Sequence, residues 1–368
     1  MGHRSACQPV THAALHLQSR YFAVEVTADM VKELRKRTGA SVGKCREALA
    51  AEGGNIDEAM TWLKKKGIAS ASAKGFREAS QGLVAMAVGQ SHGVIVELNS
   101  ETDFVARAAE FQTFLSTLAK TAATLPLTTG GKGVEELEKA DLVERVDDRI
   151  AKTNVGEALL ELSALLGERV ALRRMAWLPL PPDPATGVLG SYVHNEVRPT
   201  VGSTASLVRL RLDPPLPSPD DQQLLQRLAL ALAMQVVASR PRYITEQQVP
   251  PDVLESERQI LKAAMAASGG GPQAEKKGVI DKMVEGKLRK LFEEEVLMHQ
   301  EFVTYEKARM DAHPKATAAP GGGKEGAAAK LPTVGPALKA IGSLLGSLVE
   351  VDGVTLLGLG LPELAATL

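Results

Sequence analysis

The sequence predicts an α+β fold, and three patterns carry that prediction. Apolar residues recur with a helical period over residues 27–67, where polar cap residues separate three short segments. Residues 83–88 and 94–98 are short apolar runs joined by a turn that contains Gly and Ser, which is typical of a β-hairpin. We expect a small helical module followed by a duplicated α+β core, because the strand–strand–helix order recurs at residues 188–193, 206–212 and 219–240.

The amino-terminal segment, residues 1–22, differs in composition from the rest of the chain. It is rich in Ser, Gln and His, it carries arginines, and no acidic residue precedes Glu25. This composition is typical of an organelle transit peptide, and residues 20–22 (Arg-Tyr-Phe) are similar to a mitochondrial processing site with cleavage before Ala23. We expect a transit peptide and a mature protein in the mitochondrial matrix, with the plastid stroma as second choice. A tail without function is the alternative.

Residues 23–69 are predicted to form a module of three short helices. Asn55 is followed three residues later by Glu58, the spacing of a capping box. Gly67 follows three lysines and is placed to end the third helix in a left-handed conformation. Residues 70–81 are small and polar, which indicates a linker. The three helices begin at residues of N-cap type, Thr27, Ser41 and Asn55, and the predicted apolar face of the second helix contains Val42, Cys45 and Leu49.

Residues 82–250 are predicted to form the duplicated core. In the first copy, a helix with an apolar stripe follows the hairpin, and a second helix begins at Asn154. A strand at residues 170–177 follows. In the second copy, Ser218 and Pro219 begin a helix that ends at Arg240, because Pro241 disfavours its continuation. The stripe of the first helix contains Phe104, Ala108, Phe111, Leu115 and Leu118.

The carboxyl-terminal third is predicted in three parts. Residues 251–303 contain two periodic segments on either side of a Gly-rich break, which indicates a helical hairpin and a return to the core. Residues 304–330 are rich in Ala, Gly, Pro and Lys and are predicted to be a flexible linker. Residues 331–368 are apolar again, and we expect this segment to be too small to fold by itself.

Composition narrows the classes of function. The chain has 368 residues, which is long enough for two or three compact units. Its formal net charge is −1, whereas nucleic-acid-binding proteins usually carry a basic excess, so we expect no direct binding to nucleic acid. The two cysteines, Cys7 and Cys45, have no disulfide or metal-site spacing. No apolar stretch has the length of a membrane span, so we expect no membrane partner.

The sequence contains no recognisable motif of catalysis. It lacks a Walker-type phosphate loop, a nucleophile elbow and HExxH, and its seven histidines lack ligand spacing. Two pairs of adjacent acids, at residues 135–136 and 147–148, resemble acid/base pairs only in the sequence. Adjacent side chains on a helix point in different directions, so we interpret both pairs as solvated surface. We expect no enzymatic activity, no cofactor and no metal.

Six segments resemble the signatures of the elongation factor Ts family. The similar segments are residues 34–59 (with LRKRTGA, CREAL and GNIDEA), 101–107 (ETDFVAR), 167–174 (GERVALRR), 190–194 (GSYVH), 237–241 (VASRP) and 282–287 (KMVEGK). The resemblance implies a three-helix module of ubiquitin-associated type, a duplicated α+β core and an antiparallel helical hairpin. It also implies a partner, elongation factor Tu, in its GDP-bound and nucleotide-free states.

The resemblance implies contacts with elongation factor Tu in two parts of the chain. In the family, the pair that matches Asp103 and Phe104 is inserted beside the magnesium site of elongation factor Tu. Periodicity alone leaves other interpretations open: Phe104 as a core residue, Asp103 as a helix-start acid capped by Thr102, and the arginines as a solvated helix face. The implied contact residues are Arg35, Arg37, Val42, Thr102, Asp103, Phe104, Val105 and Arg107.

The function implied by the resemblance is guanine-nucleotide exchange on elongation factor Tu during organelle translation. The alternative is a family member that acts as a stable structural subunit of a ribosome or of a Tu–Ts assembly. Sedimentation separates the two, because a free factor runs small and a subunit stays with a large particle.

Overall fold

The computed structural model describes residues 26–73, 77–127, 133–150, 152–216, 218–267, 277–305, 331–362 and 364–367. They belong to two compact units, Met1–Lys66 and Gly67–Leu368. The transit peptide predicted for residues 1–22 lies outside the described residues, as do residues 306–330 of the predicted linker.

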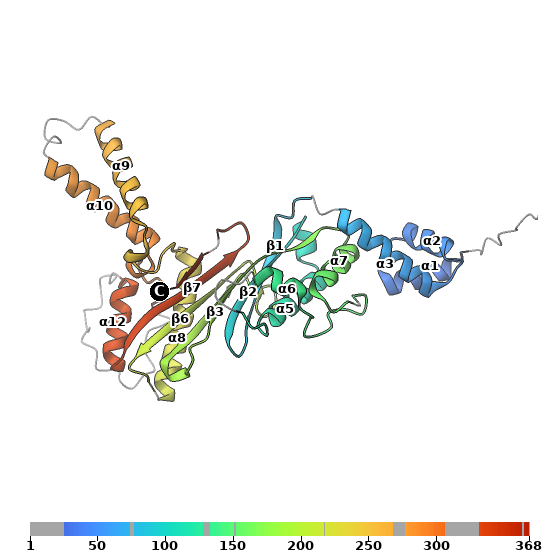
Figure 1. The fold of residues 1–368 in the computed structure, drawn as a ribbon, viewed down its shortest axis with the longest axis horizontal. Helices are drawn as coiled ribbons and strands as arrows, with labels where there is room; N and C mark the ends of the chain where they lie inside the picture. The colour runs from blue at the N-terminus through green and yellow to red at the C-terminus, as the bar shows by residue number, and fades with distance from the viewer. Residues whose placement is uncertain are drawn as a thin grey trace, which may run out of the picture. The chain divides into compact units, whose positions relative to one another are not determined.

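The first unit contains two of the three predicted helices and the first part of the third, and each helix begins at its predicted cap. The backbone amides of Met30 and Lys44 donate to the side chains of Thr27 and Ser41, and those of Asp57 and Glu58 donate to Asn55. A small core, whose buried residues are Val31, Leu34, Cys45, Ala48, Leu49 and Ala59, holds the helices together. The helices (Figure 1) are α1 (Ala28–Thr38), α2 (Val42–Ala51) and α3 (Ile56–Ala73).

The predicted end of the third helix is wrong. Gly67 does not end α3, which continues to Ala73, so residues 70–73 are helical and do not belong to a linker. The reason is that Gly67 is followed by an Ala- and Ser-rich stretch, and alanine has the highest helix propensity.

The first sheet has four strands in the order β3-β2-β1-β5, and each neighbouring pair is antiparallel. The predicted hairpin is confirmed, since β1 and β2 pair from Gln81↔Ser100 to Val88↔Gly93. Every residue of β2 is buried, because both faces of this sheet are covered. The strands are β1 (Gln81–Val88), β2 (His92–Ser100), β3 (Val170–Pro179) and β5 (Val201–Gly202).

Helices between β2 and β3 cover one face of this sheet. Phe111, Phe114 and Leu118 of α5 are buried against strand residues such as Val94 and Val96. The single helix predicted from Phe104 onward is wrong, because the chain forms a one-turn helix and then a second helix. The helices are α4 (Asp103–Ala106), α5 (Ala109–Ala122), α6 (Gly133–Lys139) and α7 (Val155–Leu166).

The second sheet has the order β4-β6-β7-β8 and is also antiparallel. Helix α8 (Pro219–Ser239) packs on it, and Arg240 ends α8 in the left-handed conformation, as expected from Pro241. Gly190 permits close contact with α8, since an added Cβ there would lie 2.2 Å from a backbone atom of Ala229. The strands are β4 (Gly187–His194), β6 (Thr204–Asp213), β7 (Leu348–Gly358) and β8 (Leu364–Thr367).

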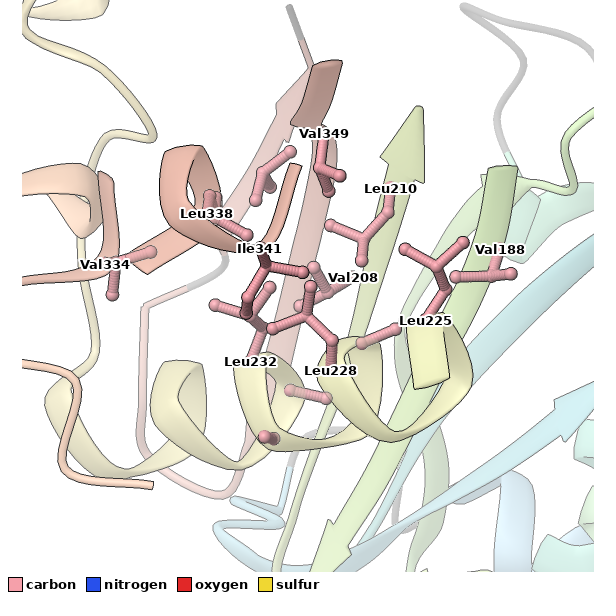
Figure 2. Close-up of a cluster of buried hydrophobic side chains, with 14 of the residues drawn as sticks. Val188, Val208, Leu210, Leu225, Leu228, Leu232, Val334, Leu338, Ile341 and Val349 are labelled. Carbon is pink, nitrogen blue, oxygen red and sulfur yellow. The ribbon is translucent and has the colours of Figure 1, made fainter. Parts of the chain in front are cut away.

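The carboxyl-terminal segment is part of the core, and the predicted core boundary at residue 250 is therefore wrong. Strand β7 pairs with β6 from Thr204↔Gly358 to Asp213↔Leu348. Helix α12 (Val334–Leu345) packs beside α8, and Figure 2 shows side chains of both helices converging with those of β4, β6 and β7. Each half of the core thus contains two long strands, a helical segment and a third long strand, and a short fourth strand, β5 or β8, completes each sheet.

The two sheets pack face to face through a third cluster of buried residues. It joins β1, β2 and β3 to β4, β6 and β7, and it contains Val84, Met86, Ile95, Ala176, Leu178, Leu189, Ala205, Leu207 and Leu357. Helices cover the outer face of each sheet, so the core is layered helix–sheet–sheet–helix. The predicted α+β class is confirmed.

The predicted helical hairpin is formed by α9 (Pro251–Ala267) and α10 (Lys277–Glu295), which pack against each other (Figure 1). At its base, the backbone amides of Arg242 and Tyr243 donate to the carbonyl of Glu295. Short 3-10 helices lie at Pro184–Thr186, Glu246–Gln248 and Leu297–His299. Among the described helices, none has both the length and the apolar character needed to cross a bilayer.

Candidate functional site

Helix α4 presents one large apolar side chain to solvent. Phe104 is 81% exposed, although it lies between a sheet and a well-packed helix. Its neighbours are anchored instead, since Ala106 is buried and Val105 packs partly against the core of the first half. An exposed phenylalanine on an anchored segment is a typical feature of a contact surface.

The exposure of Phe104 follows from the break between α4 and α5. Ala108 has an extended backbone, with φ −65° and ψ 140°, so the two helices do not continue each other. The apolar stripe therefore begins at Phe111, and Phe104 is out of phase with it. The interpretation of Phe104 as a core residue is wrong.

A helix of one turn is not stable by itself, because nucleation costs more than its hydrogen bonds return. Helix α4 is capped by Thr102, whose hydroxyl accepts a long hydrogen bond from the backbone amide of Val105 at 3.5 Å. The carbonyl of Thr102 accepts from the hydroxyl of Ser100 at 2.8 Å. Thr102, one of the predicted contact residues, therefore shapes α4 from a half-buried position.

Two carboxylates clasp the start of α4 to the start of β3. The Glu168 carboxylate accepts from the backbone amide of Thr102 at 2.9 Å and from its hydroxyl at 2.8 Å. In the reverse direction, Glu101 accepts from the backbone amide of Arg169 at 2.7 Å and forms an ion pair with Arg77 at 3.2 Å. Glu168 was recognised from the sequence only as part of the segment at residues 167–174; its contact lies 66 residues away from it and has no local signal.

The family model described as Elongation factor TS matches residues 101–319, which begin at this clasp and include both halves of it. The chain belongs to the elongation factor Ts family. The elongation factor Ts of Rhodospirillum rubrum is 40% identical over 279 residues, which are 76% of this chain and 82% of that protein. That of Agrobacterium fabrum is 35% identical over 336 residues, 91% and 93% of the two chains. That of Rickettsia felis is 36% identical over 280 residues, 76% and 82%.

The charged groups on α4 are accessible to solvent. Asp103 and Arg107, one helical turn apart, form an ion pair at 2.9 Å with both side chains in solvent. An exposed pair of this kind contributes little to stability, about 0.3–0.5 kcal/mol. Both charges remain accessible beside Phe104, so α4 offers a partner an apolar ring, an anion and a cation.

Partly buried ion pairs hold the start of α5, which follows α4. The Arg149 guanidinium contacts Glu110, in the first turn of α5, at 2.8 Å, and Asp147 at 2.7 Å. Hydrogen bonds from Arg149 hold the pKa of both carboxyls below their usual values, and the two carboxylates raise the pKa of Arg149. This half of the residue 147–148 acid pair is therefore structural.

The predicted contact residues of the first unit lie on its surface. Arg35 is exposed, and Arg37 forms ion pairs with Glu33 at 2.6 Å and with Asp57 at 3.5 Å. Val42 is 45% exposed and does not share the buried face of Cys45 and Leu49, which corrects the predicted face of α2. As the first residue of α2 it has no preceding turn to cover, since helical side chains lie over the turn before their own Cα.

Among the described residues, no group of three or more His, Cys, Asp or Glu side chains is placed to hold a metal ion. His194 forms a hydrogen bond with the hydroxyl of Tyr192 at 3.2 Å on the exposed end of β4. Around Phe104, by contrast, the structure shows an exposed aromatic ring on a backbone that hydrogen bonds hold in place.

Proposed function

We propose that this chain binds elongation factor Tu and promotes the release of its GDP, with α4 as the element that enters the nucleotide-binding domain. The observation that carries the proposal is the 81% exposure of Phe104 on a one-turn helix whose start is clasped to the start of β3. The resemblance implies that the matching Asp-Phe pair of the family is inserted beside the magnesium site of elongation factor Tu. Phe104 and Asp103 are accessible for such a contact.

An exchange factor acts by differential binding, and it needs no nucleophile or general base. It must bind nucleotide-free elongation factor Tu better than the GDP-bound form, and the coupling is reciprocal. A shift of about four decades in nucleotide affinity requires roughly 5.5 kcal/mol of differential binding. A single side chain rarely supplies that much, so several contacts must share it.

Phe104 supplies the contact that disturbs the nucleotide site. An apolar ring pushed beside the magnesium site of elongation factor Tu displaces the segment that supports the ion. Loss of the ion leaves the phosphate charge of GDP poorly compensated, because the bound cation is the largest local charge in such a site. The anchored Val105 and Ala106 resist the reaction force, since they are packed into the core of the first half.

Docking contacts hold the two proteins together while α4 acts. In the first unit, Arg35, Arg37 and Val42 offer two cations and an apolar side chain on an exposed surface. We assign to them the binding of the nucleotide domain of elongation factor Tu. In the second unit, Arg107 of α4 offers a further exposed cation.

The test is the release of labelled GDP from elongation factor Tu with and without the full chain. We expect the chain to accelerate release and the double variant Asp103→Ala/Phe104→Ala to lose about thirtyfold of that acceleration, since an aromatic anchor contributes about 2 kcal/mol. Binding of the variant to elongation factor Tu should persist, because the first unit is unchanged. Normal release by the variant, or a loss that follows unfolding, would show that the residues are wrongly chosen.

We further propose that the chain acts in organelle translation, in the mitochondrial matrix with the plastid stroma as second choice. The acid-free composition of residues 1–22 supports this proposal. Amino-terminal sequencing of the protein from isolated mitochondria should give a start near Ala23. A start at Met1 or Gly2 would contradict import with cleavage.

A further inference from the structure

We propose that Glu168 is a positioning residue for exchange: it orients Thr102, and through Thr102 it fixes the direction in which α4 presents Phe104. This inference rests on the proposed function. It adds to that function a residue that is remote from Phe104 in the sequence and acts on it through Thr102. The evidence is the geometry of the clasp at the start of α4.

The Thr102 hydroxyl has a donor and an acceptor role, and Glu168 determines how they are divided. A hydroxyl donates one hydrogen and accepts through its lone pairs. Here it donates to Glu168 at 2.8 Å, so a lone pair faces the backbone amide of Val105 at 3.5 Å. Without the carboxylate, the hydroxyl is free to rotate, and the cap of α4 is no longer set in one orientation.

The backbone amide of Thr102 is bound by the second oxygen of the same carboxylate, at 2.9 Å. The two bonds are charge-assisted and fork-like, which fixes a direction as well as a distance. They hold α4 at its N-cap residue, whose carbonyl also accepts from the backbone amide of Ala106 at 3.4 Å. A rotation of this cap swings the whole turn, because α4 consists of only four residues, Asp103–Ala106.

The backbone of Glu168 is held in place by its neighbouring elements, so its carboxylate acts from a fixed position. Glu168 lies between α7, which ends at Gly167 in the left-handed conformation, and β3, which pairs with β2 along the sheet. The adjacent amide of Arg169 donates to Glu101 at 2.7 Å, which closes the clasp in the reverse direction. Helix α4 follows β2, and Glu168 precedes β3, which pairs with β2. The same pair of strands therefore positions both α4 and the carboxylate that contacts its N-cap.

The test compares Glu168→Ala, Glu168→Gln and Thr102→Val with the wild type in labelled GDP release from elongation factor Tu over a range of concentrations of the full chain. We expect Glu168→Ala and Thr102→Val each to lower the maximal release rate about tenfold, the usual worth of a charged hydrogen bond. The half-saturating concentration should change little, because docking contacts are retained. Glu168→Gln, which keeps the shape and one acceptor, should be intermediate.

Two measurements separate positioning from loss of structure. The double variant Glu168→Ala/Thr102→Val should lose less than the two single losses combined, since both single variants remove the bond between the Thr102 hydroxyl and Glu168. Thermal melting should stay near that of Glu157→Ala, a matched control in which a carboxylate is removed from the exposed first turn of α7. If Glu168→Ala melts early, the release rate of Glu168→Gln is measured at a temperature where that variant is folded. A lowered maximal rate supports the positioning role, and the wild-type rate overturns it.

The outcomes are distinguishable from failure of the proposed function. If the wild type does not accelerate GDP release, the exchange function itself is wrong. If the wild type accelerates release, Asp103→Ala/Phe104→Ala loses it, and Glu168→Ala keeps the full maximal rate, then the positioning role of Glu168 alone is overturned. A Glu168→Ala variant that raises the half-saturating concentration at an unchanged maximal rate also overturns it, because that result assigns Glu168 to docking.

Discussion

The two halves of the core differ in the segment that joins a strand to the long helix after it: one exposes its apolar side chain and the other buries it. Between β2 and α5, the chain forms α4 and leaves Phe104 81% exposed. Between β6 and α8, Leu216 occupies the corresponding junction and is only 7% exposed. The equivalent strand-to-helix segment thus exposes an apolar side chain to solvent in the first half and buries one in the core in the second half.

The two junctions are also held by different forces. Carboxylates bind the first one, through Thr102–Glu168 and Glu110–Arg149. The second is held by burial and by neutral hydrogen bonds: the backbone amide of Leu216 donates to the carbonyl of Ala185 at 2.9 Å, and the hydroxyl of Ser347 donates to that of Pro214 at 2.7 Å. Polar bonds therefore hold the first junction without burying its apolar residue, which the proposed contact role of Phe104 requires.

The largest expected effect is on stability, and it separates the two junctions. We expect Leu216→Ala to lower the free energy of unfolding by about 2–4 kcal/mol, because truncating a buried leucine loses its transfer energy and leaves a cavity. Phe104→Ala should change it by less than about 0.5 kcal/mol, the usual range for exposed sites. Denaturant unfolding of the full chain, followed by circular dichroism, measures both.

In the GDP-release assay the order of the two variants should be reversed, with Phe104→Ala more impaired than Leu216→Ala. At a temperature where both are folded, Leu216→Ala should release GDP at the wild-type rate, and Phe104→Ala should be slow. Equal destabilisation by the two substitutions would contradict the comparison, since it would place Phe104 in the core despite its exposure. Slow release by a folded Leu216→Ala would give the second junction a role in exchange.

Local sequence signals are sufficient to predict where several of the helices begin or end. The N-caps of α1, α2 and α3 were read from Thr27, Ser41 and Asn55, because a cap is made by a side chain and amides two or three residues away. The end of α8 was read from Pro241 for a similar reason. Gly67 misled, since a glycine ends a helix only where the following residues favour another conformation.

The elements that periodicity missed depend on contacts distant in the sequence. Phe104 and Phe111 are seven residues apart, in phase on an unbroken helix, and neither Gly nor Pro marks the break between α4 and α5. The clasp that sets α4 joins residues 66 apart. Strand β7 finds β6 across the whole helical hairpin, as in the Arg211–Glu350 pair, whose members are 139 residues apart. No local pattern encodes either pairing.

The resemblance to the elongation factor Ts family supplied what periodicity lacked at Phe104. Periodicity placed the ring in the core, and the resemblance placed it on a contact surface; the exposure of 81% agrees with the second. Glu168 was contained in a recognised segment, but its role required the geometry. The direction of a side chain can follow from a family pattern, whereas the residue that enforces that direction follows from contacts.

The smallest expected effect concerns acid, and it tests whether charge holds the first junction. Hydrogen bonds from Arg149 keep the pKa of Glu110 and of Asp147 below their usual values. Carboxyls with a lowered folded-state pKa stabilise the protein above their unfolded-state pKa, near 4, and this contribution is lost as the pH falls through the folded-state pKa. We expect Arg149→Met to lower the free energy of unfolding by about 1 kcal/mol at pH 7.

The difference between wild type and Arg149→Met should therefore shrink as the pH falls below about 4, because protonated Glu110 and Asp147 no longer gain from the guanidinium. Urea unfolding at pH 7 and pH 3 measures this difference. Arg211→Met is the matched control in the second half, where Arg211 pairs with Glu350 but is 61% exposed, and its loss should be smaller. A cost of Arg149→Met that stays the same at pH 3 would mean that the arginine acts through the packing of its stem. The first junction would then be held, like the second, by burial, and the contrast between the halves would rest on the Glu168 clasp alone.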